Sequence, residues 1–412
     1  MKSEVVDKFH TETKIAIFGV GGAGCQLAKK VAQQASYIEA FLIDTDSNNL
    51  EGLASQSLTP KLSKLLLGIS SKNVIFAKIG TSNNEVRSLC KAISDYGLVF
   101  VAAGLGKGTG SRVAPIICEA ARNKEVFTLA FVVMPFSFED ITVRSSALTS
   151  LKVIAGLADT AFVTANDRGL RALTHDLRMS DAYKTTDEIV IKSILSVADL
   201  VAFHGEICIG YSDIKGLFSK AGLGCAMLSA ASGENRAKNA SNRLLSNSLA
   251  AGIPLDKASR ILVCFKDGGG DLLLSDVQDA SYLVSRAARK DADVLRGLLC
   301  GYTQQGCIEM TTLISGFEMP DLGELSPQTH VESLFNKPKQ KNDKEDQAGC
   351  SKKIRFEKRQ SPRIRIGDLL RIFHKQGRVK NWERSETTGL PNYSGDVQGQ
   401  KLTGEQSHGK RP

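Results

Sequence analysis

The 412-residue sequence predicts an α/β fold built on a parallel β-sheet. In its first half, short apolar runs alternate with segments of helical composition, and a glycine-rich stretch directly follows two of those runs. The runs that we expect to form strands are 14–18, 40–43, 74–77, 98–103 and 127–133. Strands that alternate with helices form parallel sheets covered on both faces, and ligands bind at the carboxyl ends of such strands.

The first glycine-rich stretch, 19–24, reads GVGGAG and lies between the 14–18 run and a predicted helix over 25–34. Strand, G-x-G-x-x-G and helix in this order are typical of a dinucleotide-binding loop. Asp44 and Asp46 follow the next strand, about 20 residues later, where such folds place an acidic ribose contact. A nicotinamide-dependent oxidoreductase is therefore one hypothesis. The alternative for both aspartates is turn and helix-capping chemistry.

The second glycine-rich stretch, 104–111, reads GLGKGTGS and precedes a predicted helix over 114–122. Glycines at a strand-to-helix junction turn the backbone sharply and expose amide groups, which favours a bound phosphate; a tight packing turn is the alternative. Lys107 either contacts that phosphate or is simply exposed. A second phosphate loop is not part of the dinucleotide fingerprint, and the P-loop signature is absent from the sequence. The pair of loops fits a nucleotide whose phosphates are held from two sides.

Composition limits the compartment and the partners. Nine cysteines, an odd number without C-x-x-C spacing, argue against a disulfide framework or a zinc site and indicate a reducing compartment. The sequence contains no signal-peptide pattern and no apolar run of membrane-spanning length, so we expect a cytoplasmic protein. The net charge of +9 belongs to residues 333–412, which carry +10, and the nearly neutral remainder predicts no specific nucleic-acid partner.

An ordered set of motifs resembles the FtsZ/tubulin family over about residues 14–317. In chain order the motifs are GVGGAG, DTD, AAGLGKGTGS followed by AP, MPFSFE (134–139), AND (165–167), MSDAYKTTDEI (179–189), SGENRA (232–237) and GGGDLLLSDV (268–277). The chain is identified as a divergent FtsZ-like member of this family. The resemblance implies a Rossmann-like GTP-binding domain, a central helix, a smaller α+β second domain and a disordered basic tail.

The expected parts are an N-terminal extension (1–13), a GTP-binding domain (14–185), the central helix (186–204), the second domain (205–317), a linker (318–360) and the tail (361–412). In the second domain, 261–265 and 308–315 are predicted strands. In the tail, 361–375 has apolar residues at helical spacing among arginines, which is typical of a basic amphipathic helix that docks on a membrane surface or partner. Accidental periodicity in a disordered tail is the alternative.

The resemblance implies that GTP or GDP is the bound nucleotide, with Mg²⁺ as the expected metal. Glu139 is expected to contact the ribose, Asn166 and Asp187 to read the guanine edge, and Tyr183 to stack on the base. A carboxylate accepts from the N1–H and N2–H groups of guanine, which adenine lacks. Without the resemblance, Asn166 and Asp187 would be surface polar residues and Tyr183 a core residue. The residues expected to hold the phosphates are Gly21, Gly22, Gly104, Gly106, Lys107, Gly108, Thr109 and Gly110.

The loop after the central helix differs from the family. There the pattern N-x-D-x-x-D enters the neighbouring subunit's site and helps to activate water, whereas this chain has Cys208, Gly210 and Asp213. We expect Asp213 to be the catalytic acid and hydrolysis to be weakened, since loss of one carboxylate costs about 10²–10⁴ in rate. Nearby, a ribose-contacting arginine is replaced by Val143, with Arg144 as the substitute. A phosphate loop is shortened at 80–85, and the family's Asn in DTD is Asp44.

The leading hypothesis is a cytoplasmic GTPase that assembles with itself head to tail and acts in cell division, septum formation or related membrane remodelling. Other division proteins or an anionic membrane surface, recruited through the basic tail, are its expected further partners. The alternative is a hydrolysis-deficient GTP-binding regulator or scaffold. The oxidoreductase hypothesis leaves the 104–111 loop and the Asn166, Tyr183 and Asp187 set unexplained.

Overall fold

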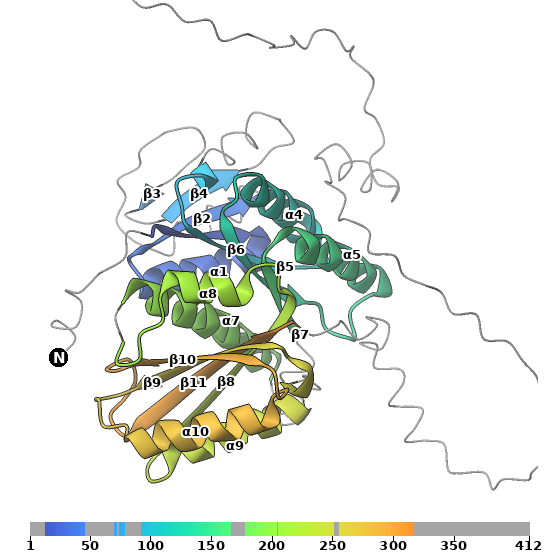
Figure 1. Cartoon of the computed structure of the whole chain (residues 1–412). Coiled ribbons are helices and arrows are strands. Elements are labelled where there is room, and N and C mark those ends of the chain that lie inside the picture. The colour runs from blue at the N-terminus through green and yellow to red at the C-terminus, as the bar shows by residue number, and fades with distance from the viewer. Residues whose placement is uncertain are drawn as a thin grey trace, which may run out of the picture. The chain divides into compact units, whose positions relative to one another are not determined.

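The computed structural model describes residues 13–45, 70–71, 74–78, 92–165, 178–203, 205–250 and 255–316, all within one compact unit (Figure 1). They form one eleven-stranded sheet in the order β10-β9-β11-β8-β7-β6-β5-β1-β2-β4-β3. The predicted linker (318–360), the tail and its amphipathic segment (361–375) lie outside the described residues.

The amino-terminal half of the sheet is parallel, as the alternating pattern predicts. Its parallel strands are β1 (Ile15–Val20), β2 (Ile38–Asp44), β4 (Val74–Lys78), β5 (Leu98–Gly104), β6 (Phe127–Met134) and β7 (Thr160–Ala165). The short β3 (Ser70–Ser71) pairs antiparallel to β4 at the edge. The sequence prediction missed β7, whose alternating threonine, alanine and apolar residues form no continuous apolar run.

Helices cover both faces of this half, which confirms the second part of the prediction. Successive strand residues point to opposite faces, so Ile15 and Ile17 belong to one core cluster and Ala16 and Phe18 to another. The first cluster includes residues of α1 (Gly21–Gln34), α7 (Met179–Ala202) and α8 (Tyr211–Phe218), and the second includes residues of α4 (Gly108–Asn123) and α5 (Ile141–Leu157) (Figure 1).

The carboxyl-terminal half of the sheet is mixed. Strand β8 pairs parallel to β7 over 222–224 and antiparallel to β11 over 224–232, so one strand continues the sheet from one half into the other. The strands are β8 (Gly222–Ser232), β9 (Arg260–Asp267), β10 (Asp293–Leu299) and β11 (Cys307–Ser315). The short α8 (Tyr211–Phe218) precedes β8, and η1 (Leu255–Lys257) precedes β9. Helices α9 (Arg236–Ala250) and α10 (Leu274–Ala287) pack side by side on this half (Figure 1).

Three helices begin earlier than the sequence predicts. Helix α1 begins at Gly21 instead of residue 25, α4 at Gly108 instead of 114, and α7 at Met179 instead of 186. Glycine is a poor helix former, which is why the sequence prediction placed the glycines outside α1 and α4, whereas the added residues of α7 (179–185) are mostly polar or exposed and lie outside its apolar stripe. The amide groups of a helix's first turn have no intrahelical acceptor, so glycines in that turn cost no helical hydrogen bonds through those amides. Tyr183 and Asp187 consequently lie on one continuous helix.

A buried polar cluster joins α7 to β9 and to the segment before β2. Lys266 Nζ lies 2.7 Å from Asp199 Oδ2, and the Tyr37 hydroxyl donates to Asp199 Oδ1. Burial, and then the charge of Asp199, raise the pKa of Tyr37. Burial, the largest single cause, lowers the pKa of Lys266, but the surrounding negative charges, chiefly that of Asp199, and the hydrogen bond to Asp199 together raise the pKa of Lys266 above its ordinary value. An ion pair removed from water in this way stabilises the fold only while both partners are present.

Candidate functional site

The two glycine loops meet at the carboxyl ends of β1 and β5. A Cβ atom built on Gly21 would lie 3.0 Å from the Gly110 nitrogen, and one built on Gly110 would lie 2.1 Å from the Gly104 oxygen. Only glycines allow this approach of backbone to backbone. Because α1 begins at Gly21 and α4 at Gly108, the amino ends of two helices lie side by side, each with first-turn amides that no helical carbonyl can accept. Their partial positive charges favour an anion between them.

The loop between β5 and α4 is held by its own hydrogen bonds. The Gly106 amide donates to Ser111 Oγ at 2.7 Å, and the Leu105 amide donates to the Val133 oxygen at 2.9 Å. In contrast, no described atom outside their own neighbourhood lies within 4 Å of a Cβ built on Gly22 or Gly108. These two exposed glycines therefore mark the open surface at the paired amino ends of α1 and α4, where a phosphate has room to approach.

Asp44 links the end of β2 to α4. Its Oδ1 accepts from Thr109 Oγ1 at 2.9 Å and from the Thr45 amide at 2.7 Å, and its side chain is buried, with the residue 2% exposed. Thr109 Oγ1 also lies 2.6 Å from Thr45 Oγ1. A ribose-reading carboxylate has to be accessible, so Asp44 does not fit the oxidoreductase hypothesis. Asp46 lies outside the described residues.

The predicted base-reading side chains lie on α7, beside α1. Asp187 Oδ2 is 2.7 Å from Lys30 Nζ of α1, an ion pair that the sequence analysis did not foresee. Tyr183, one turn earlier, is 48% exposed and meets Phe136 edge to face, with ring centroids 5.2 Å apart. An exposed ring one turn from the carboxylate is suited to stacking on a base, and the alternative of a core tyrosine is wrong. Asn166 lies outside the described residues.

Glu139 and Lys107 form an ion pair across the mouth of this site. Lys107 Nζ lies 2.5 Å from Glu139 Oε2, while Glu139 Oε1 accepts from the Phe136 amide at 3.1 Å. The hydrogen bond that Lys107 donates to Glu139, and then the negative charge of Glu139, raise the pKa of Lys107, which remains a cation. Arg144, the predicted substitute for the ribose-contacting arginine, donates from Nη1 to the Ser137 oxygen at 2.7 Å. It thus supports the loop that carries Glu139.

Asp213, in the first turn of α8, lies on the side of the sheet where the strands have their amino ends. The Tyr211 hydroxyl of α8 donates to the Gly97 oxygen at 2.9 Å, and Thr160 Oγ1 donates to the Phe218 oxygen at 2.7 Å. Gly97 and Thr160 stand at the amino ends of β5 and β7, whereas the glycine loops follow the carboxyl ends. A seven-residue strand such as β5 spans about 20 Å, which separates Asp213 from its own chain's glycine loops.

Comparisons with known proteins agree with this geometry. Residues 14–174 match the model of the GTPase domain of the Tubulin/FtsZ family. This match covers the amino-terminal part of the chain and supports a divergent tubulin/FtsZ-like protein. An empty FtsZ dimer of M. jannaschii is 22% identical, covers 74% of this chain and 89% of its own, and has a TM-score of 0.64.

Two further solved structures share the fold. CetZ2 from Haloferax volcanii, solved as a protofilament with bound GTPγS, is 20% identical over 78% of this chain and 98% of its own, with a TM-score of 0.56. TubZ from Bacillus thuringiensis serovar israelensis, solved as GDP-form protofilaments, is 11% identical over 78% of this chain and 94% of its own, with a TM-score of 0.57. At these identities the likeness concerns the fold.

In this tubulin/FtsZ-like protein, Asp213 caps the amino end of α8. Its Oδ2 accepts from the Gly210 amide at 2.8 Å. A Cβ built on Gly210 would lie 3.4 Å from that oxygen, an ordinary contact, so a larger side chain fits at this position. Cys208 Sγ donates to the Gly205 oxygen at 3.0 Å. Asp213 is therefore the carboxylate at the predicted catalytic position, and it also caps α8.

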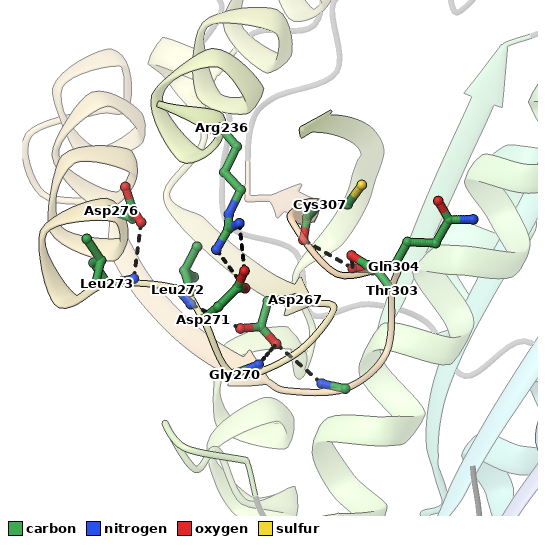
Figure 2. Close-up of polar contacts among 11 residues, drawn as sticks. Arg236, Asp267, Gly270, Asp271, Leu272, Leu273, Asp276, Thr303, Gln304 and Cys307 are labelled. Atoms are coloured by element: carbon green, nitrogen blue, oxygen red, sulfur yellow. Dashed lines mark hydrogen bonds and ion pairs between the residues drawn. The ribbon is translucent and has the colours of Figure 1, made fainter. Parts of the chain in front are cut away.

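The turn before α10 is held by polar contacts (Figure 2). The Arg236 guanidinium binds Asp271 with two contacts of 2.7 and 3.1 Å, and Asp267 accepts from the Gly270 amide at 3.2 Å. These contacts fix the turn before Leu273 and Leu274, which are 64% and 73% exposed. The pattern GGGDLLL, singled out in the sequence for its resemblance alone, thus also holds an exposed apolar pair.

The described residues contain neither a cluster of metal ligands nor a helix of membrane-spanning character. Within the described ranges, no three His, Cys, Asp or Glu side chains gather into a group that could hold a metal ion. The described residues thus offer Mg²⁺ no ligand set of their own, and this ion commonly binds largely through nucleotide phosphates and water. Of the helices in the described part of the chain, none is long and apolar enough to cross a membrane.

Proposed function

We propose that this chain binds GTP or GDP, assembles with itself head to tail, and hydrolyses GTP at the contact between two subunits. The tubulin/FtsZ-like GTPase domain supports the nucleotide and the type of reaction. The observation that carries the proposal is the meeting of two glycine-bearing helix ends at Gly21 and Gly110, because a double amide nest is suited to a chain of phosphates.

The nucleotide is oriented by groups on three elements. The first-turn amides of α1 and α4, with Gly22 and Gly108 at their open surface, hold the phosphates. Lys107, already a cation at the loop, neutralises phosphate charge after leaving Glu139, which then contacts the ribose. Tyr183 stacks on the base, and Asp187 and Asn166 accept and donate at the guanine edge.

Hydrolysis is completed in trans. Asp213 lies at the amino ends of the strands, about 20 Å from the glycine loops at the carboxyl ends. It can reach a nucleotide only in a second copy stacked along the strand direction, where its carboxylate would orient the attacking water. Such a contact joins two different surfaces and therefore propagates as a filament. Exposed Phe138 and Ile141 beside the nucleotide loops, and Leu273 and Leu274 on the other half, provide apolar surface for association.

The biological role that we propose is cell division, septum formation or related membrane remodelling in the cytoplasm, at the division site or the inner membrane surface. It rests on the family resemblance and on the basic tail. The CetZ2 and TubZ protofilaments support self-assembly as the shared property of relatives. Mg²⁺ is proposed to bind together with the nucleotide phosphates.

A second candidate is a GTP-binding regulator or scaffold without hydrolysis. One observation favours it: Gly210 contributes no carboxylate, and the remaining Asp213 is engaged by the Gly210 amide. In that case the surface with the glycine loops and the surface with α8 would still associate, and the nucleotide would serve only to stabilise the conformation of the loops.

Phosphate release measured against protein concentration, together with light scattering, tests the two candidates. We expect a rate per molecule that rises steeply with concentration as scattering appears, since each site needs two subunits. Asp213→Ala should abolish phosphate release and retain GTP binding. Asp291→Ala is the control, because Asp291 is an exposed carboxylate that pairs with Arg289 at 2.5 Å and has no part in the proposed site or contact.

Mixing experiments separate action in trans from action in cis. When Asp213→Ala protein is mixed with Gly22→Ala protein, which keeps Asp213 but carries a methyl group at the phosphate-binding surface, phosphate release should exceed the sum of the two separate rates, because a mixed contact combines an intact nucleotide site with an intact Asp213. A rate equal to that sum would refute the shared site. Scattering without phosphate release in the parent protein would establish the scaffold instead.

A further inference from the structure

The contact between Lys30 and Asp187 joins two helices at the base end of the proposed nucleotide site. Lys30 Nζ lies 2.7 Å from Asp187 Oδ2, and the side chains are 42% and 26% exposed. A fully exposed ion pair contributes little to the free energy of folding. This pair is half-buried, however, and one of its members is the residue expected to read guanine.

The position of Lys30 along α1 matches the length of a nucleotide. Gly21 begins α1 at the phosphate nest, and Lys30 follows nine residues later, about 13 Å along the helix axis. Helices α1 and α7 pack in the same core cluster, which brings Asp187 to Lys30. Tyr183, four residues before Asp187, lies on the same face of α7. The base-stacking ring, the carboxylate and the lysine therefore share one corner.

The charges at this site explain why a cation is needed there. The Asp187 carboxylate is expected to accept both guanine donors, yet a bound nucleotide removes it from water and adds phosphate charge of the same sign. Burying an unpaired carboxylate is costly, and a paired one much less so. Lys30 occupies Oδ2 with a direct charge-assisted bond, which also fixes the rotamer of the carboxylate.

We propose that Lys30 determines guanine specificity by positioning Asp187: its ammonium holds the carboxylate in place and turned toward the base. Lys30 does not touch the base itself, so it is a positioning residue. The inference rests on the proposed function, because it assumes that a guanine nucleotide occupies this site. It goes further by assigning nucleotide selectivity to a residue of α1 that no motif in the sequence identified.

Binding of GDP, IDP and ADP to the full-length protein, measured by isothermal titration calorimetry, tests the proposal without any need for turnover. IDP lacks the 2-amino group of guanine, and ADP lacks both donors. Lys30→Met keeps the aliphatic stem and removes the charge, and Lys30→Arg restores a cation. Lys184→Met is the control, because Lys184 forms an exposed ion pair of 3.3 Å with Asp181 on the same helix as Asp187.

We expect Lys30→Met to lower the preference for GDP over ADP by about tenfold, as for loss of a charge-assisted contact, and Asp187→Ala to lower it by about a hundredfold. Lys30→Arg should stay within about threefold of the parent, and Lys184→Met should match it. Circular dichroism should give identical spectra for Lys30→Met and the parent protein.

The remaining outcomes distinguish this inference from the proposed function. If Lys30→Met weakens all three nucleotides equally, or strengthens GDP, Lys30 does not position the carboxylate and the inference is overturned. If Asp187→Ala lowers the preference while Lys30→Met leaves it unchanged, the inference alone fails. If neither variant changes the preference, the assignment of Asp187 to the guanine edge is wrong, and the inference falls with it.

Discussion

Gly22→Ala is expected to separate nucleotide binding from folding. Gly22 is the second residue of α1, and no described heavy atom lies within 4 Å of a Cβ built there. The added methyl group therefore meets no protein atom of the described ranges. Glycine costs about 1 kcal/mol relative to alanine in a helix interior, and somewhat less at a helix end. The variant should be more stable than the parent by up to about 1 kcal/mol, which corresponds to about 2 °C in Tm.

The same methyl group lies on the open surface of the amide nest, where it keeps a phosphate from close approach. We expect GDP affinity to fall by at least about tenfold, since two or more hydrogen bonds to the phosphate are lost or lengthened. The assay pairs thermal unfolding without nucleotide with GDP titration calorimetry. Gly156→Ala is the matched control, because Gly156 lies in α5 and no described heavy atom is within 4 Å of its built Cβ.

Two results would refute the reasoning about Gly22. Unchanged GDP affinity would mean that the phosphates do not approach α1 at its second residue. A clear loss of stability in Gly22→Ala, with Gly156→Ala gaining stability as expected, would mean that Gly22 is needed by the fold. The comparison is sharp because Gly110→Ala, which places Cβ 2.1 Å from a carbonyl oxygen, must disturb the backbone whatever the ligand.

Three further expectations concern the buried cluster and the catalytic loop. Lys266→Met should lower the free energy of unfolding in urea by about 3–5 kcal/mol, because it leaves Asp199 buried without its cation; a loss below about 1 kcal/mol would contradict this. The pKa values of Tyr37 and Lys266 are raised in the folded protein, so their contribution to stability is complete below a pH of about 10 and is lost as the pH rises further. In Tyr37→Phe, the free energy of unfolding should therefore fall less steeply with pH above about 10. Gly210→Asp restores a carboxylate where a side chain fits, and phosphate release by assembled protein should rise by about 10² unless Asp213 alone suffices.

The glycine loops and the parallel half of the sheet follow from local sequence because each rests on a short, contiguous signal. A buried strand such as β5 is a continuous apolar run, and G-x-G-x-x-G after a strand has one common structural meaning. Strand β8 carries no such signal, since its small residues GLGCAMLSAAS fit a strand only when β7 and β11 lie on either side.

Other parts of the site depend on distances that a sequence does not contain. The role of Lys30 depends on the face of α1 that meets α7. Lys30 and its partner Asp187 are 157 positions apart in the chain. The opposite placement of Asp213 follows from Tyr211 and Thr160 contacting the strand ends. The role of Asp44 likewise becomes visible only when Thr109 of α4 is beside it. Asn166 and the domain boundaries remain predictions.

The strands themselves connect the two edges of the molecule. Helix α8 is hydrogen-bonded at the amino ends of β5 and β7, and the 105–107 loop continues directly from the carboxyl end of β5. An extended strand has a fixed rise per residue, so it behaves as a strut of nearly constant length. In a head-to-tail polymer, pulling force would pass along these struts and load their interstrand hydrogen bonds in shear, all at once. The nucleotide loops can then tilt one subunit against the next without changing the subunit's own length.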